Sequence, residues 1–468
     1  MMSVAEAALA LAARVHLRGG ASSAWAAADS ARFHGVSTDS RAIERGALFV
    51  ALRGERFDGH AFLAAVAARG AVAAIVDETA MLALRGNDEV PPALIVVDDT
   101  RQALGRLAAH WRSRFDIPLV AVSGSNGKTT VKEMIALILR AHYGAECTLS
   151  TAGNFNNDIG LPLTLLRLRA GHAAGVVEIG MNHPGETRVL GAIARPTVAL
   201  VNNAQREHQE FMSSVAEVAR EHGALFDSLS PQGVAVINAD DAHADYWRGL
   251  NTGRRVRDFG IAHAAAVTGC YEFRNFGSEI VLDAPEGTAR FELNAAGVHS
   301  VRNAVAAAAA ATAAGASLAA VAAGLSGFSA VKGRLERKTS RRGAVVIDDT
   351  YNANPDSVRA AIDVLGHCPA PRVLVLGDMG EVGDAGPAYH AEIGAHARAS
   401  GVTQLLALGD MTPHVVAAGG PTARHFTTFE DLMRQVREAD GPGTTFLVKG
   451  SRFMRMERVV ESLTGEID

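Results

Sequence analysis

A glycine-rich loop is the segment whose residue types point most directly to chemistry. Residues 123–130 read Ser-Gly-Ser-Asn-Gly-Lys-Thr-Thr, between an apolar run suited to a buried strand and a helical pattern over residues 131–141. In that context the two glycines let backbone N–H groups approach phosphate oxygens, and the helix N-terminus favours negative charge. Lys128 is suited to neutralise β- and γ-phosphates, and the Thr129 hydroxyl is suited to bind Mg²⁺. The loop therefore predicts a nucleotide site.

The loop is shorter than the commonest phosphate-binding spacing, because Val122 stands where that pattern has its first glycine. A tight turn carrying a surface lysine is the alternative. The combination of strand, glycines, lysine and threonine favours nucleotide binding. The predicted nucleotide-binding residues of the loop are Gly124, Ser125, Asn126, Gly127, Lys128, Thr129 and Thr130.

Polar residues also follow other apolar runs of strand length. Glu178 ends the run 175–179, and His208 follows the run 197–201. Ligands of open α/β sheets bind at the carboxyl ends of the strands, where a carboxylate can bind a metal. A glutamate paired with an arginine and a surface histidine are the alternatives. The asparagine-rich run 154–157 is typical of a turn when taken alone.

Composition limits the function classes. The 468 residues carry 45 Lys and Arg against 50 Asp and Glu, and no basic block indicates a nucleic-acid partner. The 3 cysteines lie far apart and predict reduced thiols rather than disulfides or a metal cluster. The apolar stretch 4–15 contains Glu6 and predicts an amphipathic helix, and the alanine-rich stretch 303–331 predicts two buried helices separated near Gly315. We therefore expect a cytoplasmic protein without a membrane segment.

The alternation of strand-length apolar runs with helical patterns predicts an α/β fold of three domains. Residues 1–100 form a small N-terminal α/β domain in this prediction. Residues 101–333 form the central phosphate-loop domain around a parallel, doubly wound sheet. The polar, basic stretch 337–342 is interpreted as a break before the C-terminal, Rossmann-like α/β domain, residues 334–468.

The shortened loop 123–130 resembles that of the Mur ligases and folylpolyglutamate synthases, and the resemblance to the Mur ligase family extends over nearly the whole chain. It implies a UDP-sugar-binding N-terminal domain, an ATP-binding central domain and a C-terminal domain that closes over both. The implied reaction is phosphorylation of a carboxylate by ATP with Mg²⁺, followed by attack of an amine on the acyl phosphate.

The resemblance assigns roles to individual residues. In the central domain it implies Thr129, Glu178 and His208 as Mg²⁺ ligands, Thr151, Asn156 and Asn157 as contacts to the sugar–peptide substrate, and Asn303 as the adenine contact. His299 stands at the matching position of a histidine that precedes the adenine-reading asparagine.

Further roles fall in the other two domains. Ser40 and Arg41 correspond to the uridine-diphosphate half of the site, and Arg334 to an arginine that meets ATP phosphate. The run 348–357 matches a segment in which Asp349 binds ribose and Tyr351, Asn352 and Asn354 lie near the reaction centre. Lys449 and Ser451 belong to another matching loop. The implied catalytic residues are Lys128, His208, Arg334 and Asn352.

The runs 348–357, 377–383 and 447–452 are most similar to the family member that adds D-alanyl-D-alanine to UDP-N-acetylmuramoyl-tripeptide. A sister ligase that adds a single amino acid is the alternative within the family. A nucleotide-binding protein without activity is the alternative outside it. The family also implies a monomer.

One position departs from the family pattern. The family often has a lysine, carbamoylated by CO₂, whose carbamate binds a second Mg²⁺, but this sequence has His222 at the corresponding position, preceded by Glu221. No lysine lies between Lys132 and Lys332, so no shift of the alignment restores it. The hypothesis from the sequence is that Glu221, water or substrate oxygens hold the second ion without a carbamate.

Overall fold

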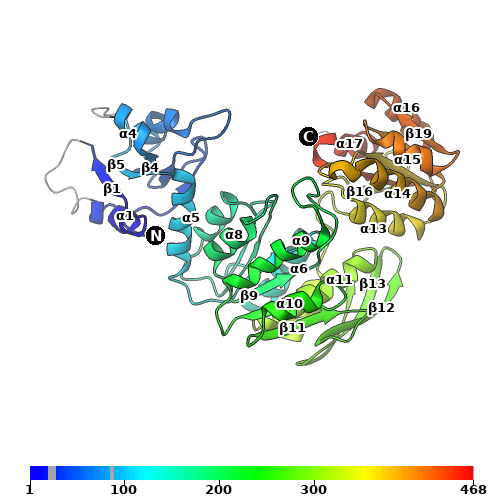
Figure 1. Cartoon of the computed structure of the whole chain (residues 1–468), viewed down its shortest axis with the longest axis horizontal. Coiled ribbons are helices and arrows are strands. Elements are labelled where there is room, and N and C mark those ends of the chain that lie inside the picture. Colours follow the sequence, from blue (N-terminus) through cyan, green and yellow to red (C-terminus); the bar gives the residue numbers. More distant parts are fainter. Residues whose placement is uncertain (19–27, 85–88, 467–468) are drawn as a thin grey trace.

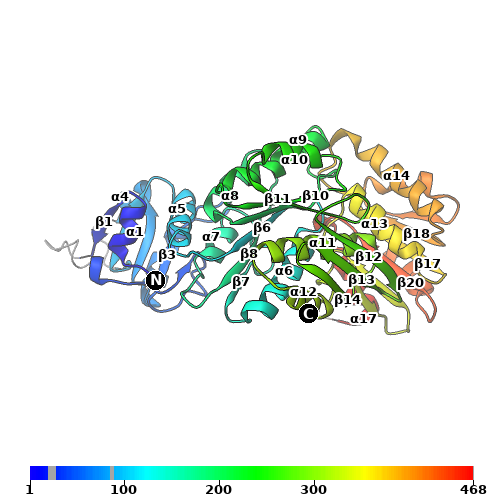
Figure 2. The same ribbon diagram turned by 90° about the horizontal axis from the view of Figure 1, so that it is seen from below.

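The computed structural model describes residues 1–18, 28–84 and 89–466 of the chain. Its strands form three sheets, one in each third of the molecule, and these lie in a row with the largest in the middle (Figures 1 and 2). Helices accompany each sheet, and most neighbouring strands are parallel. The predicted three-domain α/β fold class is confirmed.

The N-terminal sheet has the strand order β1-β5-β4-β3-β2, with β1 antiparallel to β5 and the other pairs parallel. The predicted helix over residues 4–15 is wrong in its second half. The helix ends at Ala10, the chain turns at Ala12 with a φ of 50°, and Val15 pairs with Ile95 in the sheet. The bounds are α1 Val4–Ala10, β1 Arg14–Leu17, β2 Val36–Ser37, β3 Leu48–Val50, α3 Leu63–Ala68, β4 Ala73–Asp77, α4 Glu78–Leu84 and β5 Ala93–Val97.

The central sheet has the order β14-β13-β12-β11-β10-β9-β6-β8-β7. Its strands run parallel from β7 to β12, whereas β12, β13 and β14 form an antiparallel ribbon that the sequence pattern did not predict. The strands are β6 Leu119–Ser123, β7 Thr148–Ser150, β8 Ala174–Glu178, β9 Val198–Val201, β10 Val234–Asn238, β11 Arg255–Gly260, β12 Val267–Arg274, β13 Gly277–Ala284 and β14 Gly287–Leu293.

Helices cover both faces of this sheet. One face packs against α6 Lys128–Tyr143, α11 Val298–Ala313 and α12 Leu318–Ser326. The other packs against α5 Thr100–Arg112, α7 Gly160–Leu165, α8 Glu186–Ala194, α9 Val215–Gly223 and α10 Ala244–Leu250. The alanine-rich stretch forms two helices that separate at Gly315, which has a φ of 95°, so that prediction is confirmed.

The C-terminal sheet has the order β15-β16-β20-β17-β18-β19. The stretch 337–342, predicted as a polar break, instead contributes to β15, an edge strand antiparallel to β16 with alternating exposure. The pattern was misleading because an edge strand can be charged on its solvent side. The elements are β15 Glu336–Thr339, β16 Val345–Asp349, α13 Pro355–Gly366, β17 Arg372–Gly377, α14 Gly386–Ala399, β18 Gln404–Leu408, α15 Thr412–Gly419, β19 Ala423–Phe426, α16 Phe429–Ala439, β20 Thr445–Lys449 and α17 Glu457–Thr464.

Within residues 1–18, 28–84 and 89–466, every helix is too short or too polar to cross a membrane.

The close packing of α12 on α6 predicts how alanine substitutions at two glycines, Gly324 and Gly327, change stability. A Cβ on Gly324 would lie 2.7 Å from the backbone N and Cα of Ile138, whereas a Cβ on Gly327 would meet no atom closer than 3.5 Å. In an open helix, glycine to alanine adds up to about 1 kcal/mol of stability. Gly324→Ala should instead lower the free energy of unfolding, by about 1–3 kcal/mol for overpacking. Urea unfolding measures the effect, and the matched Gly327→Ala control should be neutral or slightly stabilising.

Candidate active site

A cleft of about 1720 Å³ lies between the central and C-terminal domains. Its central wall is formed by loops that follow β6, β8 and β9, and its opposite wall includes the loops that follow β16 and β17. These loops leave the carboxyl ends of parallel strands, the usual ligand position in open α/β sheets. The cleft is therefore the candidate active site.

The phosphate loop fits tightly against its neighbours. Gly127 begins α6 with a φ of 83°, and a Cβ there would lie 2.5 Å from Asn303 Oδ1. Gly124 has a φ of 132°, and a Cβ there would lie 3.0 Å from the backbone nitrogens of Asn202 and Asn203. Both positions require glycine for conformation and for space. The loop thus presents its backbone, rather than side chains, at the start of a helix.

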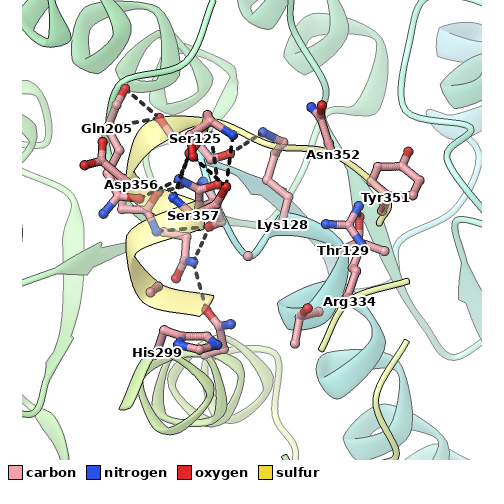
Figure 3. Close-up of a pocket in the computed structure, with 18 of the residues that line it drawn as sticks. Ser125, Lys128, Thr129, Gln205, His299, Arg334, Tyr351, Asn352, Asp356 and Ser357 are labelled. Carbon is pink, nitrogen blue, oxygen red and sulfur yellow. Dashed lines mark hydrogen bonds between the residues drawn. The ribbon is translucent and has the colours of Figure 1, made fainter. Parts of the chain in front are cut away.

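Lys128 points along this loop rather than out of the cleft. Its ammonium donates to the Gly124 and Ser125 carbonyl oxygens, and it lies 3.4 Å from Glu207 Oε2. Figure 3 shows the Lys128 side chain inside the cleft, beside Ser125. Burial alone would raise the pKa of Glu207, but the Lys128 ammonium and the hydrogen bond from His222 outweigh it and lower that pKa to about 2. The loop therefore has a fixed anionic partner for its lysine.

His222 is fully buried behind the loop. Its Nδ1 lies 2.9 Å from the Ser123 hydroxyl and its Nε2 lies 2.7 Å from Glu207 Oε1. Burial lowers the pKa of His222, although Glu207 opposes the shift, so the ring is neutral at neutral pH. A neutral ring with its proton on Nε2 donates to Glu207 and accepts from Ser123.

Glu178 offers a carboxylate oxygen that has no partner. The residue is 2 % exposed, and its Oε1 accepts a hydrogen bond from Asn156 Nδ2 at 2.8 Å. Its Oε2 is buried without a hydrogen-bond partner. The Thr151 hydroxyl accepts from the Glu178 backbone N–H, which makes Thr151 part of the wall behind the cleft. Asn157 lines the cleft, but its side-chain oxygen accepts a hydrogen bond from the backbone N–H of Gly160.

His208 lies at the boundary between the two domains. It adopts a φ of 49°, and its Nε2 lies 3.8 Å from Glu207 Oε2. Its Nδ1 contacts Glu381 of the C-terminal domain without hydrogen-bond alignment. The histidine therefore faces the same part of the cleft as Lys128 and Glu207.

The N-terminus of α11 forms the far end of the cleft. Asn303 accepts a hydrogen bond from Asn202 Nδ2 at 3.1 Å and lines the cleft beside Gly127. Burial, with Lys449 and Arg302 nearby, lowers the pKa of His299 to about 4, so this imidazole is neutral at neutral pH. Aromatic rings of the β12–β13 ribbon also line this end, and they are Tyr271, Phe273 and Phe276. A flat, apolar base would find suitable neighbours here.

Residues of the C-terminal side meet the phosphate loop directly. The Arg334 guanidinium donates to the Thr129 hydroxyl at 2.9 Å and lies 4.1 Å from the Tyr351 ring centroid. Figure 3 shows these three side chains next to one another, with Asn352 above them. Asp349 is occupied differently, because its carboxylate binds the Lys449 ammonium and the Leu335 backbone N–H. Burial raises the pKa of Asp349 despite that lysine.

Other predicted residues brace these loops. Lys449 also donates to the Asn352 carbonyl oxygen at 2.8 Å. Asn354 caps α13 and donates to Asn126 Oδ1 at 3.0 Å, which joins the two domains. The Ser451 hydroxyl donates to the Ala353 carbonyl and accepts from the Gly380 N–H, and it lies behind the cleft wall.

Ser40 and Arg41 lie apart from this cleft, in the N-terminal domain. Neither residue lines the cleft, and Arg41 is an exposed side chain bonded to Asp39 at 2.9 Å. Their assignment to the uridine-diphosphate half of the site stays a prediction.

The structure contradicts a metal-binding role for Glu221. Its two carboxylate oxygens accept hydrogen bonds from the backbone N–H groups of Gly185 and Thr187, each at 2.8 Å. Those groups belong to the first turn of α8, where a carboxylate is stabilised by otherwise unpaired donors. The sequence prediction did not include Glu207 among the site residues. Its carboxylate directly precedes the predicted ligand His208 in the chain, and that position was a signal that could have identified it.

A cluster of charges holds the C-terminal domain against the central one. Arg206 donates to Asp356 Oδ1 at 2.6 Å and to Glu392 Oε2 at 2.7 Å, and its guanidinium lies 5.0 Å from the Tyr389 ring centroid. Arg359, on the same side as Glu392, donates to it at 3.0 Å. Arg206 is therefore the member of this cluster that crosses between domains.

The contacts of Arg206 predict that its substitution separates the two domains. Arg206→Gln should open the cleft, because the side-chain hydrogen bonds of the guanidinium to two carboxylates, Asp356 and Glu392, are lost. A hydrogen bond between charged groups is worth at most about 1.5–3 kcal/mol before solvent screening. Small-angle X-ray scattering should show a larger radius of gyration. The matched Arg359→Gln variant, which removes a contact within one domain, should leave that radius unchanged. Equal radii for all three proteins would contradict the prediction.

Comparisons with known proteins agree with this architecture. Three family models match: the Mur ligase family catalytic domain over residues 32–112, the Mur ligase middle domain over 122–311 and the Mur ligase glutamate ligase domain over 333–452. The chain is 40% identical to the UDP-N-acetylmuramoyl-tripeptide--D-alanyl-D-alanine ligase of Escherichia coli, over 92% of this chain and 93% of that protein. It is 32% identical to the Bacillus subtilis protein of the same name, over 92% and 93% of the two chains.

Solved structures show the same arrangement. The crystal structure of MurF from Acinetobacter baumannii matches with a TM-score of 0.87 and 33% identity, over 99% of each chain. MurF from Thermotoga maritima in complex with ADP has the same fold, with a TM-score of 0.80 over 93% of this chain and 98% of that one. The resemblance predicted from the loop is thereby confirmed, and the chain belongs to the Mur ligase family.

Proposed function

We propose that this chain is the ATP-dependent ligase that joins D-alanyl-D-alanine to UDP-N-acetylmuramoyl-tripeptide. One observation carries the proposal: a single cleft contains the phosphate loop, the buried Glu178 carboxylate and the loop 349–354 of the C-terminal domain. These are the parts that ATP-dependent activation of a carboxylate needs on two facing walls. The names of relatives that align over nearly their full length support the same reaction and the same two substrates.

The residues at Glu178 fit a magnesium ion. A buried carboxylate oxygen without a hydrogen-bond partner is costly unless a cation or a proton binds there. Thr129 lies in the loop on the same wall, and its hydroxyl is an oxygen ligand of the kind that Mg²⁺ prefers. In the part of the chain that the structure describes, no three His, Cys, Asp or Glu side chains form a ready cluster. That fits an ion held by one or two side chains together with phosphate oxygens and water.

The chain's own residues support the first chemical step. Lys128 and Arg334 flank the loop and offset negative charge on the γ-phosphoryl group, while Mg²⁺, when bound, adds further positive charge. The terminal carboxylate of the tripeptide attacks the γ-phosphorus, the bond to the β-phosphate oxygen breaks, and ADP leaves. The product of this step is an acyl phosphate.

The second step needs a dry cleft. The amine of D-alanyl-D-alanine attacks the acyl carbon, the carbon–oxygen bond to phosphate breaks, and an amide forms as the nitrogen loses a proton, which the departing phosphate accepts. Water would compete for the acyl phosphate, so closure of the C-terminal domain protects it. Asn354 on Asn126 and Arg206 on Asp356 support such closure from two positions.

A cytoplasmic location and a monomeric state are further parts of the proposal. Cys147, Cys270 and Cys368 are free thiols, in keeping with a reducing compartment.

Release of inorganic phosphate by the purified chain tests the reaction. The assay contains ATP, Mg²⁺ and UDP-N-acetylmuramoyl-tripeptide, with either D-alanyl-D-alanine or single amino acids. Release that requires the dipeptide, together with a product heavier by that dipeptide less water, supports the proposal. Release with a single amino acid makes the chain a sister ligase. ATP binding without release under any condition overturns the proposal of an enzyme.

Arg334 provides a test of the phosphoryl-transfer geometry. Arg334→Met should lower kcat by about 10²–10³-fold, the usual cost of one donor to developing charge. The KM for ATP should change far less, because Arg334 touches the loop through Thr129 alone among its residues. Steady-state kinetics measures both constants. Lys332→Met, which removes an exposed charge two residues away, is the matched control and should retain activity. Equal kcat values for the two variants would contradict the role of Arg334.

A further inference from the structure

We propose that Glu207, oriented by His222, is a ligand of a divalent cation separate from the one at Glu178. The inference rests on the proposed function, since it concerns the phosphate end of the same nucleotide site. It assigns a binding role to a carboxylate that the sequence did not single out, and it gives the buried His222 a purpose.

The Glu207 carboxylate is held in one orientation. Its side chain is 7% exposed, and Oε1 lies 2.7 Å from His222 Nε2. His222 cannot rotate freely, because its Nδ1 lies 2.9 Å from the Ser123 hydroxyl at the end of β6. Carboxylates that bind metals are commonly fixed by hydrogen bonds from the residues behind them, and His222 supplies such a bond. Glu207 Oε1 is thereby engaged by His222, and Oε2 is the carboxylate oxygen left to bind a cation.

Glu207 Oε2 lies close to the side-chain nitrogens of Lys128 and His208, where a cation would bind. It lies 3.4 Å from Lys128 Nζ and 3.8 Å from His208 Nε2. Two ligands of one Mg²⁺, each about 2.1 Å from the ion, are separated by about 3.0 Å when adjacent and about 4.2 Å when opposite. The observed 3.8 Å between Glu207 Oε2 and His208 Nε2 is about 0.4 Å shorter than the opposite arrangement and about 0.8 Å longer than the adjacent one, so a side-chain movement of that size brings both groups onto one ion. Contact of His208 Nδ1 with Glu381 leaves Nε2 directed to this side.

Charge balance also favours a cation at this point. Lys128 is the countercharge of Glu207 in the present arrangement. When ATP binds, the same ammonium is needed at the β- and γ-phosphates, and the triphosphate adds negative charge beside Glu207. A buried carboxylate that loses its partner is strongly disfavoured. A divalent cation between Glu207 and a phosphate oxygen removes this conflict.

The two cation sites have different supports. Glu178 is tied to Asn156 and Thr151, whereas Glu207 is tied to Lys128 and His222. Neither carboxylate shares a hydrogen-bond partner with the other. Substitution at one site should therefore leave the other able to bind.

The pairing of Glu207 with His222 also has a chemical consequence. A lysine becomes a carboxylate donor only after its amine adds to CO₂ and loses a proton. An imidazole held by Ser123 and Glu207 undergoes no such change, and Glu207 is a carboxylate from the outset. Binding of the ion should therefore be independent of bicarbonate.

Counting of bound Mn²⁺ tests the proposal. The full chain is mixed with a non-hydrolysable ATP analogue and titrated with Mn²⁺, and free Mn²⁺ is measured by electron paramagnetic resonance. We expect two Mn²⁺ per bound nucleotide. Glu207→Gln should weaken one of them at least tenfold, while nucleotide affinity in the presence of the other stays within threefold. Glu178→Gln should weaken the other ion. Glu210→Gln, an exposed glutamate on the same loop, is the matched control and should bind both ions normally.

Two results of the Mn²⁺ count would overturn the proposal, and a third concerns bicarbonate. One is a wild-type protein that binds a single Mn²⁺, and the other is a Glu207→Gln variant that binds both with wild-type affinity. If thermal unfolding shows that Glu207→Gln does not fold, Glu207→Asp decides by the same criterion, since it withdraws the carboxylate by one methylene. Titrations with and without bicarbonate should coincide, and a bicarbonate-dependent second ion would equally overturn the inference.

The result is separable from that of the proposed function. Metal counting uses neither the tripeptide nor the dipeptide, so a failed ligation assay leaves it intact. Conversely, dipeptide-dependent release of phosphate with a single bound ion would support the ligase and overturn the role of Glu207.

Discussion

The cleft depends on a backbone that leaves no room for side chains at two points. Gly124 and Gly127 bring the phosphate loop against Asn202, Asn203 and Asn303, at distances that a Cβ could not share. The end of β6, the end of β9 and the start of α11 are therefore fixed relative to one another. This contact sets the positions of the polar groups around the loop. The charged residues around the loop are thereby held where they can form hydrogen bonds to a bound ligand.

Much of this framework follows from the sequence because short-range patterns determine it. The runs at 119–123, 174–178 and 198–201 are buried throughout and apolar up to their last residue, as strands covered on both faces are, and they were identified within a residue or two. The phosphate loop was evident from residue types alone. The ribbon β12–β14 was not, because the prediction followed continuous apolar runs, whereas these strands alternate between buried and exposed residues over much of their length.

The remaining differences arise from tertiary contacts that no local pattern carries. The helix predicted to reach Val15 ends early because residues 14–17 gain a partner strand almost eighty residues away in the chain. From the sequence, Glu221 was proposed as a metal ligand and Glu207, a residue of the same type, was not considered. The structure separates them because Glu221 meets the first turn of α8 and Glu207 meets the phosphate loop. Asp349 and Lys449 were assigned separately, although they bind each other.

The buried helix α11 has a consequence for motion. Seven of its twelve buried residues are alanines, which have no side-chain rotamers to exchange when a neighbour shifts. A helix of this composition transmits displacement as a rigid rod rather than absorbing it by repacking. His299 and Asn303, in its first turns, should therefore keep their spacing from the phosphate loop while the C-terminal domain opens and closes. The base of the nucleotide would then be bound to the stationary part of the molecule, and the moving part would meet the phosphates.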